Sequence, residues 1–315
     1  MLSILATVAP VFLLIAIGYV AVRSGYLPDG LAEALNQFAA RLAVPVLLFS
    51  AIGRLDLGEA FAAPVLIGFY AGAFTCFVIG IVMARSVFKR RPGEAVAVGF
   101  AATFSNSLLL GVAIVERSHG APSLTFAFGI IAVHAPLIYT VGILTMELMR
   151  RDGRTLPETL TVAGRSILAN PLMIGILAGL ALNLSGLTLP EPVTVAKDML
   201  SRAAIPVALV GIGAGMTRYR LRANLPEAGM VAVLSLFLHP AIAFTLTHLV
   251  FDLPADAVRA AVTLAAMPPG VNIYLFATLY NRAIDLAATA FLLATMASVV
   301  TATLWLYVLE RALGA

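Results

Sequence analysis

The chain has 315 residues, of which 61% are hydrophobic and 11% are charged, and its mean hydropathy is +1.00. Soluble domains carry about a quarter charged residues, so this composition excludes a soluble protein and indicates a polytopic membrane protein. The net charge of +4 does not indicate nucleic-acid binding, because the basic residues fall in short loops between apolar segments. The single cysteine, Cys76, excludes an intrachain disulfide.

Ten apolar segments have roughly the 20 residues that a helix needs to cross a bilayer. They lie at about 3–22, 31–53, 60–84, 94–116, 123–148, 167–184, 193–216, 227–250, 256–280 and 286–309. The first has no basic region before it and no cleavage site, so we expect a retained helix rather than a signal peptide. The loops are too short for an extramembrane domain.

Basic residues are distributed unequally between the two sets of alternate loops. Thirteen lie on one side: Arg23, Arg85, Lys89, Arg90, Arg91, Arg150, Arg151, Arg154, Arg165, Arg218, Arg220, Arg222 and Arg282. Five lie on the other: Arg54, Arg117, Lys197, Arg259 and Arg311. Because loops rich in Lys and Arg stay in the cytoplasm, we expect a multi-pass protein of the cell inner membrane with both termini on the outer side.

The two halves of the chain repeat each other. Four motifs recur in order at offsets of 161–163 residues: 3–6 at 166–169, 24–28 at 185–190, 41–46 at 202–207, and 94–96 at 256–258. Each half holds five spans, an odd number, so the second half must enter the membrane from the opposite side. The sequence therefore predicts a 5+5 inverted-topology repeat, typical of secondary transporters, with halves 1–149 and 167–315 and a cytoplasmic linker at 150–166.

The ninth span is interrupted by Met-Pro-Pro-Gly-Val-Asn, residues 267–272. Pro268 and Pro269 remove two helical N–H donors, and Gly270 adds backbone freedom. Non-helical backbone at bilayer depth survives only where it is buried in protein or lines a watery cavity. A broken helix with an amide, Asn272, beside the break is typical of a substrate or ion site. A proline kink packed between helices is the structural alternative.

The repeat predicts a second break in the fourth span. At the repeat offset Pro268 corresponds to Asn106, which lies in the mid-span polar cluster Ser105, Asn106 and Ser107. Serine and asparagine compete with helical hydrogen bonding, which favours a break. Two half-helices that begin at the centre would turn their positive dipole ends toward it, which favours an anion. Alternatively, each asparagine joins neighbouring helices, and each serine bonds to its own helix.

Several motifs resemble the auxin efflux carrier family, whose bacterial members are described as organic-acid or malonate-type permeases. They are Ala9-Pro10-Val11-Phe12 with Gly18-Tyr19, Pro45, Asn170-Pro171, Pro206, His239-Pro240, the Asn106…Gly111 segment and, most specifically, Pro268-Pro269-Gly270-Val271-Asn272. The resemblance covers the whole chain. The long hydrophilic central loop of the plant hormone carriers is absent, so auxin is not the expected substrate.

The resemblance implies an all-α integral membrane fold like those of bile-acid symporters and sodium/proton antiporters, with ten transmembrane helices and a crossover of broken helices 4 and 9. Spans 1, 2, 6 and 7 would form a scaffold that dimerises, and spans 3–5 and 8–10 would form the transport domain. The matching family site positions are Asn106 and the backbone of Pro268, Pro269, Gly270, Val271 and Asn272; Ser105 and Ser107 flank the first of these.

Four further residues are candidates because they are ionisable and lie within spans. His134 and His239 are candidates for proton coupling, since imidazole titrates near neutral pH; alternatively, each donates to a carbonyl freed by the nearby Pro136 or Pro240. Arg41 and Arg202 occupy equivalent repeat positions and could attract an anion. Their alternatives are side chains that extend to the membrane surface and, for Arg202, an ion pair with Asp198.

Together these features predict a secondary transporter that moves a small organic anion by alternating access and binds it where helices 4 and 9 cross. The alternative is an uncoupled uniporter or channel on the same scaffold. The sequence holds no metal-ligand cluster, no nucleophile–base arrangement and no ATP-binding motif, so we expect neither an enzyme nor a cofactor. The expected partners are the substrate anion, the lipid bilayer and a second copy of the chain, but no nucleic acid.

Overall fold

The computed structural model describes residues 2–28, 30–150, 164, 170–219 and 224–314. Within these ranges the regular structure is helical, apart from one isolated bridge between Ser105 and Pro269. Seven helices are long and apolar enough to cross a membrane: Ile4–Arg23, Leu31–Ile52, Leu57–Ser86, Ala121–Met149, Glu191–Met216, Leu225–Val250 and Ile284–Leu313. They correspond to seven of the ten predicted spans, and the helical class of an integral membrane protein is confirmed.

The other three predicted spans are shorter or interrupted helices. The fourth is α6 (Pro92–Thr103) followed by the π-helical segment η2 (Ser107–Gly111) and α7 (Val112–His119). The ninth is α14 (Ala255–Ala265) followed by α15 (Asn272–Tyr280).

The described part of the sixth predicted span is α10 (Pro171–Ser185). It begins at a side-chain cap, because Asn170 Oδ1 accepts from the Leu172 N–H at 2.9 Å. Several sequence predictions lie outside the described residues: the start of this span, most of the 150–166 linker, the repeat motif at 166–169, and the side chains of Arg150, Arg151, Arg154, Arg165, Arg220 and Arg222.

The chain forms two compact units. Unit 1 comprises residues 1–9, 61–163 and 219–315, and unit 2 comprises residues 10–60 and 164–218. Helix α1 (Leu2–Arg23) contributes its first turns to unit 1 and the rest to unit 2.

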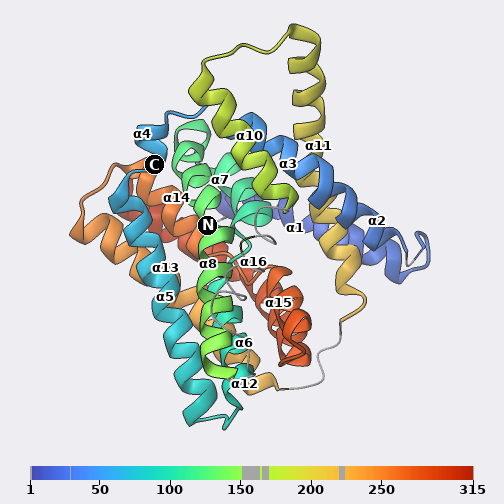
Figure 1. The fold of residues 1–315 in the computed structure, drawn as a ribbon, viewed down its shortest axis with the longest axis vertical. Helices are drawn as coiled ribbons and strands as arrows, with labels where there is room; N and C mark the ends of the chain where they lie inside the picture. The colour runs from blue at the N-terminus through green and yellow to red at the C-terminus, as the bar shows by residue number, and fades with distance from the viewer. Residues whose placement is uncertain (1, 29, 151–163, 165–169, 220–223, 315) are drawn as a thin grey trace. The chain divides into compact units, whose positions relative to one another are not determined.

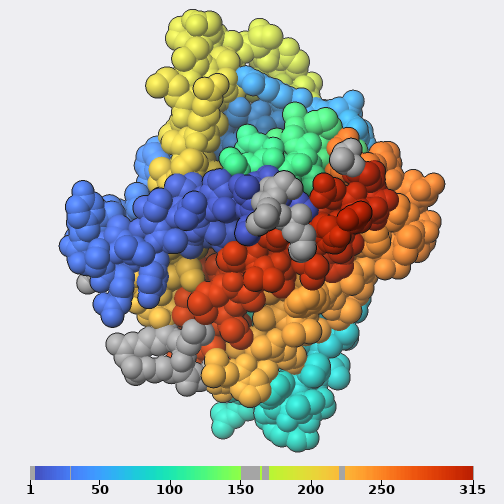
Figure 2. All heavy atoms as spheres, turned by 180° about the vertical axis from the view of Figure 1, so that it is seen from behind, coloured from blue at the N-terminus to red at the C-terminus, as the bar shows by residue number. Residues whose placement is uncertain are grey.

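Unit 1 is built around long helices. They are α5 (Ala63–Ser86), α8 (Ala121–Arg150), α16 (Ile284–Leu313), and the continuous stretch of α12 (Leu225–Val233), η3 (Leu234–Leu238), α13 (His239–Phe244) and η4 (Thr245–Val250). Helix α5 lies beside α6 and α13, and α8 packs on α14 (Figure 1). On the face shown in Figure 2, α16 (red) lies along the orange helices α12 and α14.

A proline within unit 1 explains the position of the single tryptophan. Pro240 has no N–H to donate to the carbonyl of Leu236, four residues earlier. The Trp305 indole N–H of α16 donates to this carbonyl at 2.9 Å. The freed acceptor is therefore satisfied by a neighbouring helix, which joins α13 to α16.

Unit 2 holds α2 (Leu31–Phe38), η1 (Ala39–Ala43), α3 (Val44–Ile52), α4 (Leu57–Ala60), α10 and α11 (Glu191–Met216). Helix α3 packs against both α10 and α11. Glycines allow this close approach, because a Cβ at Gly175 would meet the backbone of Pro45 and one at Gly179 would lie 2.9 Å from the Phe49 carbonyl oxygen. Small residues at helix contacts are typical of membrane proteins.

Candidate functional site

Two interrupted helices of unit 1 are joined at their breaks. The Asn106 N–H donates to the Pro268 carbonyl at 2.7 Å, and the Gly270 N–H donates to the Phe104 carbonyl at 3.0 Å. Residues 104–106 and 268–270 therefore form a short antiparallel pair, which we call the paired segments. They supply each other's backbone hydrogen bonds at a place where neither is helical.

The two breaks have different local causes. Helix α14 ends before Pro268 and Pro269, which lack the N–H groups that would continue it. The first break has no proline, and serine side chains take over hydrogen bonding there. Ser105 Oγ lies 2.6 Å from Ser107 Oγ, and Ser107 Oγ lies 3.4 Å from the Leu264 carbonyl near the end of α14.

The helices that start at the paired segments leave backbone donors without partners. The N–H groups of Ser107, Leu108 and Leu109 have no acceptor among the described residues, and the same holds for Val271 and Asn272. Leu108 and Leu109 are half-buried and Val271 is exposed. These helix starts therefore present donors and partial positive charge at a partly accessible edge of unit 1.

The ends of α6 and α14 bring partial negative charge to the same place, but the bridge reduces it. The carbonyls of Phe104 and Pro268 accept the two bridge hydrogen bonds, and the Asn106 carbonyl accepts from Leu110 and Gly111. The bridge thus satisfies some of the acceptors at these helix ends, while the donors at the starts of η2 and α15 stay available to an anion.

The two predicted asparagines lie in different environments. Asn106 is 8% exposed, and its side-chain amide has no hydrogen-bond partner among the described residues. Asn272 is half-buried, and its Oδ1 accepts from the Tyr139 hydroxyl at 3.2 Å. Tyr139 thereby fixes the Asn272 amide with its NH₂ group available for another acceptor. Tyr139 could not be recognised from the sequence, since an aromatic residue inside an apolar span carries no local signal.

Aromatic rings pack behind the paired segments. The Phe104 ring lies 5.4 Å from that of Tyr139 and 4.8 Å from that of His134. Phe100 and Phe276 stack with centroids 3.9 Å apart. These mostly buried rings line the inner side of the paired segments, and the partly exposed residues lie at their other edge.

The two candidate histidines are both buried in unit 1 but differ in their partners. His239 is fully buried, and its Nε2 lies 3.1 Å from the Phe69 carbonyl of α5. His134 is 4% exposed, and neither ring nitrogen meets hydrogen-bond geometry with any described residue. The carbonyl that Pro240 frees is bonded to Trp305 and not to a histidine, so the predicted alternative role is wrong for His239.

The candidate arginines lie in unit 2. Arg41 and Arg202 are exposed, and neither has an ion pair within the described ranges. The alternative pair of Arg202 with Asp198 is wrong, because Asp198 instead pairs with Lys197 at 2.7 Å and with Arg54 at 3.4 Å.

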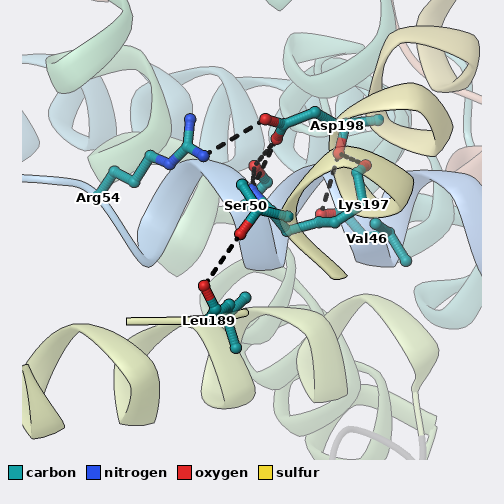
Figure 3. Close-up of polar contacts among 8 residues, drawn as sticks. Val46, Ser50, Arg54, Leu189, Lys197 and Asp198 are labelled. Atoms are coloured by element: carbon teal, nitrogen blue, oxygen red, sulfur yellow. Dashed lines mark hydrogen bonds and ion pairs between the residues drawn. The ribbon is translucent and has the colours of Figure 1, made fainter. Parts of the chain in front are cut away.

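Lys197, which the sequence placed among the basic residues of the loops, is buried instead. Its side chain is 7% exposed, and its Nζ donates to Ser50 of α3 at 2.6 Å as well as to Asp198 (Figure 3). A charged residue can be buried in this way because a carboxylate and a hydroxyl satisfy it.

A cavity of about 320 Å³ lies elsewhere in unit 1, at the ends of α1, α7, α14 and α16. Its lining includes Ser118, His119, Arg259 and Glu310. His119 Nε2 lies 3.2 Å from the Thr263 hydroxyl. No group of three or more metal-ligating side chains occurs among the residues that the structure describes.

Comparison with known proteins agrees with the membrane architecture. A family model described as "Membrane transport protein" matches residues 3–306. A protein of Rhizobium meliloti named "Putative malonate transporter" is 26% identical, over 98% of this chain and 97% of its own length. An "Uncharacterized transporter" of Methanothermobacter thermautotrophicus is 24% identical, over 96% of this chain and 97% of its own length.

Proposed function

The chain belongs to the family of membrane transport proteins, the auxin efflux carrier family, and from this premise we propose that it is a secondary transporter of a small organic anion. The anion binds at the paired segments of unit 1 and crosses the membrane by alternating access. A short dicarboxylate such as malonate is the substrate class that we propose, because a relative that matches over nearly the whole chain carries a malonate transporter name.

The unmet donors at the paired segments are the observation that carries this proposal. Five backbone N–H groups, those of Ser107–Leu109 and of Val271 and Asn272, lack acceptors within the described ranges. The unpartnered Asn106 amide and the NH₂ group of Asn272 add side-chain donors. Carboxylate oxygens are acceptors only, so a carboxylate can satisfy these groups without bringing a competing donor.

Helix boundaries support the proposed 5+5 repeat. Helix α8 spans residues 121–150 and α16 spans 284–313, so both their starts and their ends are 163 residues apart. Helices α6 and α14 begin at 92 and 255, again 163 apart, and end at 103 and 265, which is 162 apart. These offsets match the 161–163 residues of the sequence motifs. We therefore propose ten spans with the paired segments as the crossover of the fourth and ninth.

The division into two units supports the proposed roles of the spans. Unit 2 contains most of the first span and all described residues of the second, sixth and seventh. Unit 1 contains the third to fifth and the eighth to tenth. We propose that unit 2 is the scaffold, which pairs with a second copy of the chain, and that unit 1 carries the substrate. In the proposed topology both termini lie on the outer side of the cell inner membrane.

The residue-level test is uptake of labelled malonate into proteoliposomes by the wild type and by Asn106→Ala and Asn272→Ala. A hydrogen bond to a charged group contributes about 1.5–3 kcal/mol, so each change should lower the uptake rate per reconstituted protein by about tenfold to a hundredfold. Thr140→Val is the matched control, because its hydroxyl bonds to the Pro136 carbonyl on α8. If both alanine variants are folded and take up malonate at the wild-type rate, the paired segments are not the site.

A further inference from the structure

His134 is a buried histidine of unit 1 for which neither ring nitrogen is in hydrogen-bond geometry with a described group, and the Ser105 backbone is the polar group nearest to acting on it. It is 4% exposed, and both Nδ1 and Nε2 are buried without a hydrogen-bond partner. An unpaired polar group in an apolar setting costs free energy, and an unpaired charge costs far more. The ring is therefore neutral in this conformation.

The surroundings of His134 bring no charge to it. The ring packs against Phe69 and Tyr70 of α5 and against Phe104. The Tyr70 hydroxyl is occupied by the Ile130 carbonyl at 2.8 Å. Among the described groups that act on the ring, His239 is the titratable one and the Ser105 backbone is the other polar one. On α14, which also packs on α8, Asp256 bonds to Ser123, eleven residues or about 16 Å along the helix from His134.

His134 nevertheless lies directly behind the proposed anion site. Its ring centroid is 4.8 Å from that of Phe104, the first residue of the paired segments, and Ser105 is the next residue. A carboxylate held at the starts of η2 and α15 would place a negative charge in the same low-dielectric region. Opposite charges attract strongly there, so the bound anion would stabilise the protonated form of the nearby imidazole.

We propose that His134 takes up a proton when a carboxylate binds at the paired segments, so that the protein carries about one proton with each substrate anion. The inference rests on the proposed function. A new N–H bond forms at the unprotonated ring nitrogen, with the proton supplied by water on the side from which the anion enters. The same bond breaks, and the proton returns to water, when the anion leaves on the other side.

His239 does not take this role, although the two rings share the Phe69 side chain. Its Nε2–H donates to the Phe69 carbonyl at 3.1 Å, and a Cβ at the neighbouring Gly72 would lie 2.8 Å from the His239 ring. His239 thus fixes α13 closely against α5. It provides an internal comparison, since it is as deeply buried as His134 but is held by a backbone carbonyl.

The experiment is malonate accumulation in proteoliposomes with the membrane potential clamped at zero and the outside about one pH unit more acidic. One proton per anion should raise the steady-state accumulation of the wild type up to about tenfold. His134→Gln should take up malonate saturably but reach no accumulation, because glutamine cannot carry the proton. His239→Gln and His248→Gln should accumulate malonate like the wild type.

The outcomes separate this inference from the proposed function. If the wild type shows no saturable malonate uptake, the proposed function fails. If uptake is saturable but the gradient drives none of it, or drives His134→Gln equally, only the proton inference fails. Equal accumulation by His134→Gln would mean that malonate carries its own proton.

A binding measurement keeps the test independent of the variant's folding. Malonate added to the wild-type protein in weakly buffered detergent solution should remove close to one proton per bound anion from solution, as reported by a pH-sensitive dye. Release of protons, or no change at saturating malonate, would overturn the inference.

Discussion

At the residue scale, the candidate site combines one satisfied amide with one unsatisfied amide. Asn272 is oriented by the Tyr139 hydroxyl, whereas Asn106 has no side-chain partner within the described ranges and is only 8% exposed. The Asn106 amide atoms are not among the fully enclosed unpaired atoms of the described residues, so a ligand at the proposed site could complete their hydrogen bonds. Asn106 should therefore be the more sensitive of the two to substitution.

His119, at the cavity between the ends of α7 and α14, makes stability depend on pH. Burial lowers the pKa of His119 to about 4, with Arg259 adding to the shift and Asp256 opposing it. The unfolded chain binds the proton below the ordinary value of 6.5 and the folded unit does not. Folding is therefore unaffected above about pH 6.5 and is destabilised progressively between 6.5 and 4.

His119→Gln should reduce this acid sensitivity, because glutamine can still bond to Thr263 but does not titrate. The difference amounts to about 1–2 kcal/mol near pH 5. It is measured as the change in apparent Tm of detergent-solubilised protein between about pH 7.5 and pH 5, at one scan rate. An equal loss of Tm in both proteins would show that His119 does not cause the sensitivity.

At the element scale, sequence and structure agree most closely on where the helices are interrupted. The break after α14 was predictable because two prolines cannot continue a helix. The break after α6 has no proline and was predictable from the repeat, which aligns Asn106 with Pro268, and from the polar cluster of serines and asparagine around it. The hydrogen bonds that join the breaks could not be predicted, since they depend on how two distant segments approach each other.

The same limit explains the residues that sequence reasoning misassigned. Lys197 was counted as a loop residue because it lies close to the start of its span, yet packing of α11 against α3 buries it beside Ser50. Tyr139 was missed because its role depends on Asn272 of another helix. Periodicity and composition describe single helices, whereas both of these contacts join two.

Lys197 contacts Asp198 and Ser50 where α3 packs against α11. We expect the two members of the ion pair to differ in how much their substitution lowers stability. Asp198→Asn should lower the apparent Tm more than Lys197→Met, because the first leaves a buried ammonium without its carboxylate and the second removes the buried charge. Asp198 is 34% exposed and retains Arg54 when the lysine is lost. The double variant should recover much of what Asp198→Asn loses. If the two single losses simply add, the pair is not coupled as the structure indicates.

At the scale of the whole molecule, the family membership and seven apolar helices establish a multi-pass membrane transport protein. The proposed roles of scaffold and substrate carrier follow the two compact units, and the paired segments lie wholly inside unit 1. A carrier of this kind returns its substrate site across the membrane in each cycle. An uncoupled channel on the same scaffold would have no such step, and this separates the two alternatives.

Counterflow is the most direct test of the central claim. Proteoliposomes loaded with unlabelled malonate are diluted into a trace of labelled malonate, with the membrane potential clamped at zero. A carrier with one alternating site should accumulate label transiently above its equilibrium level, and loading with an uncharged solute should abolish the overshoot. Label that only equilibrates, at a rate independent of the malonate inside, would contradict alternating access and indicate a channel.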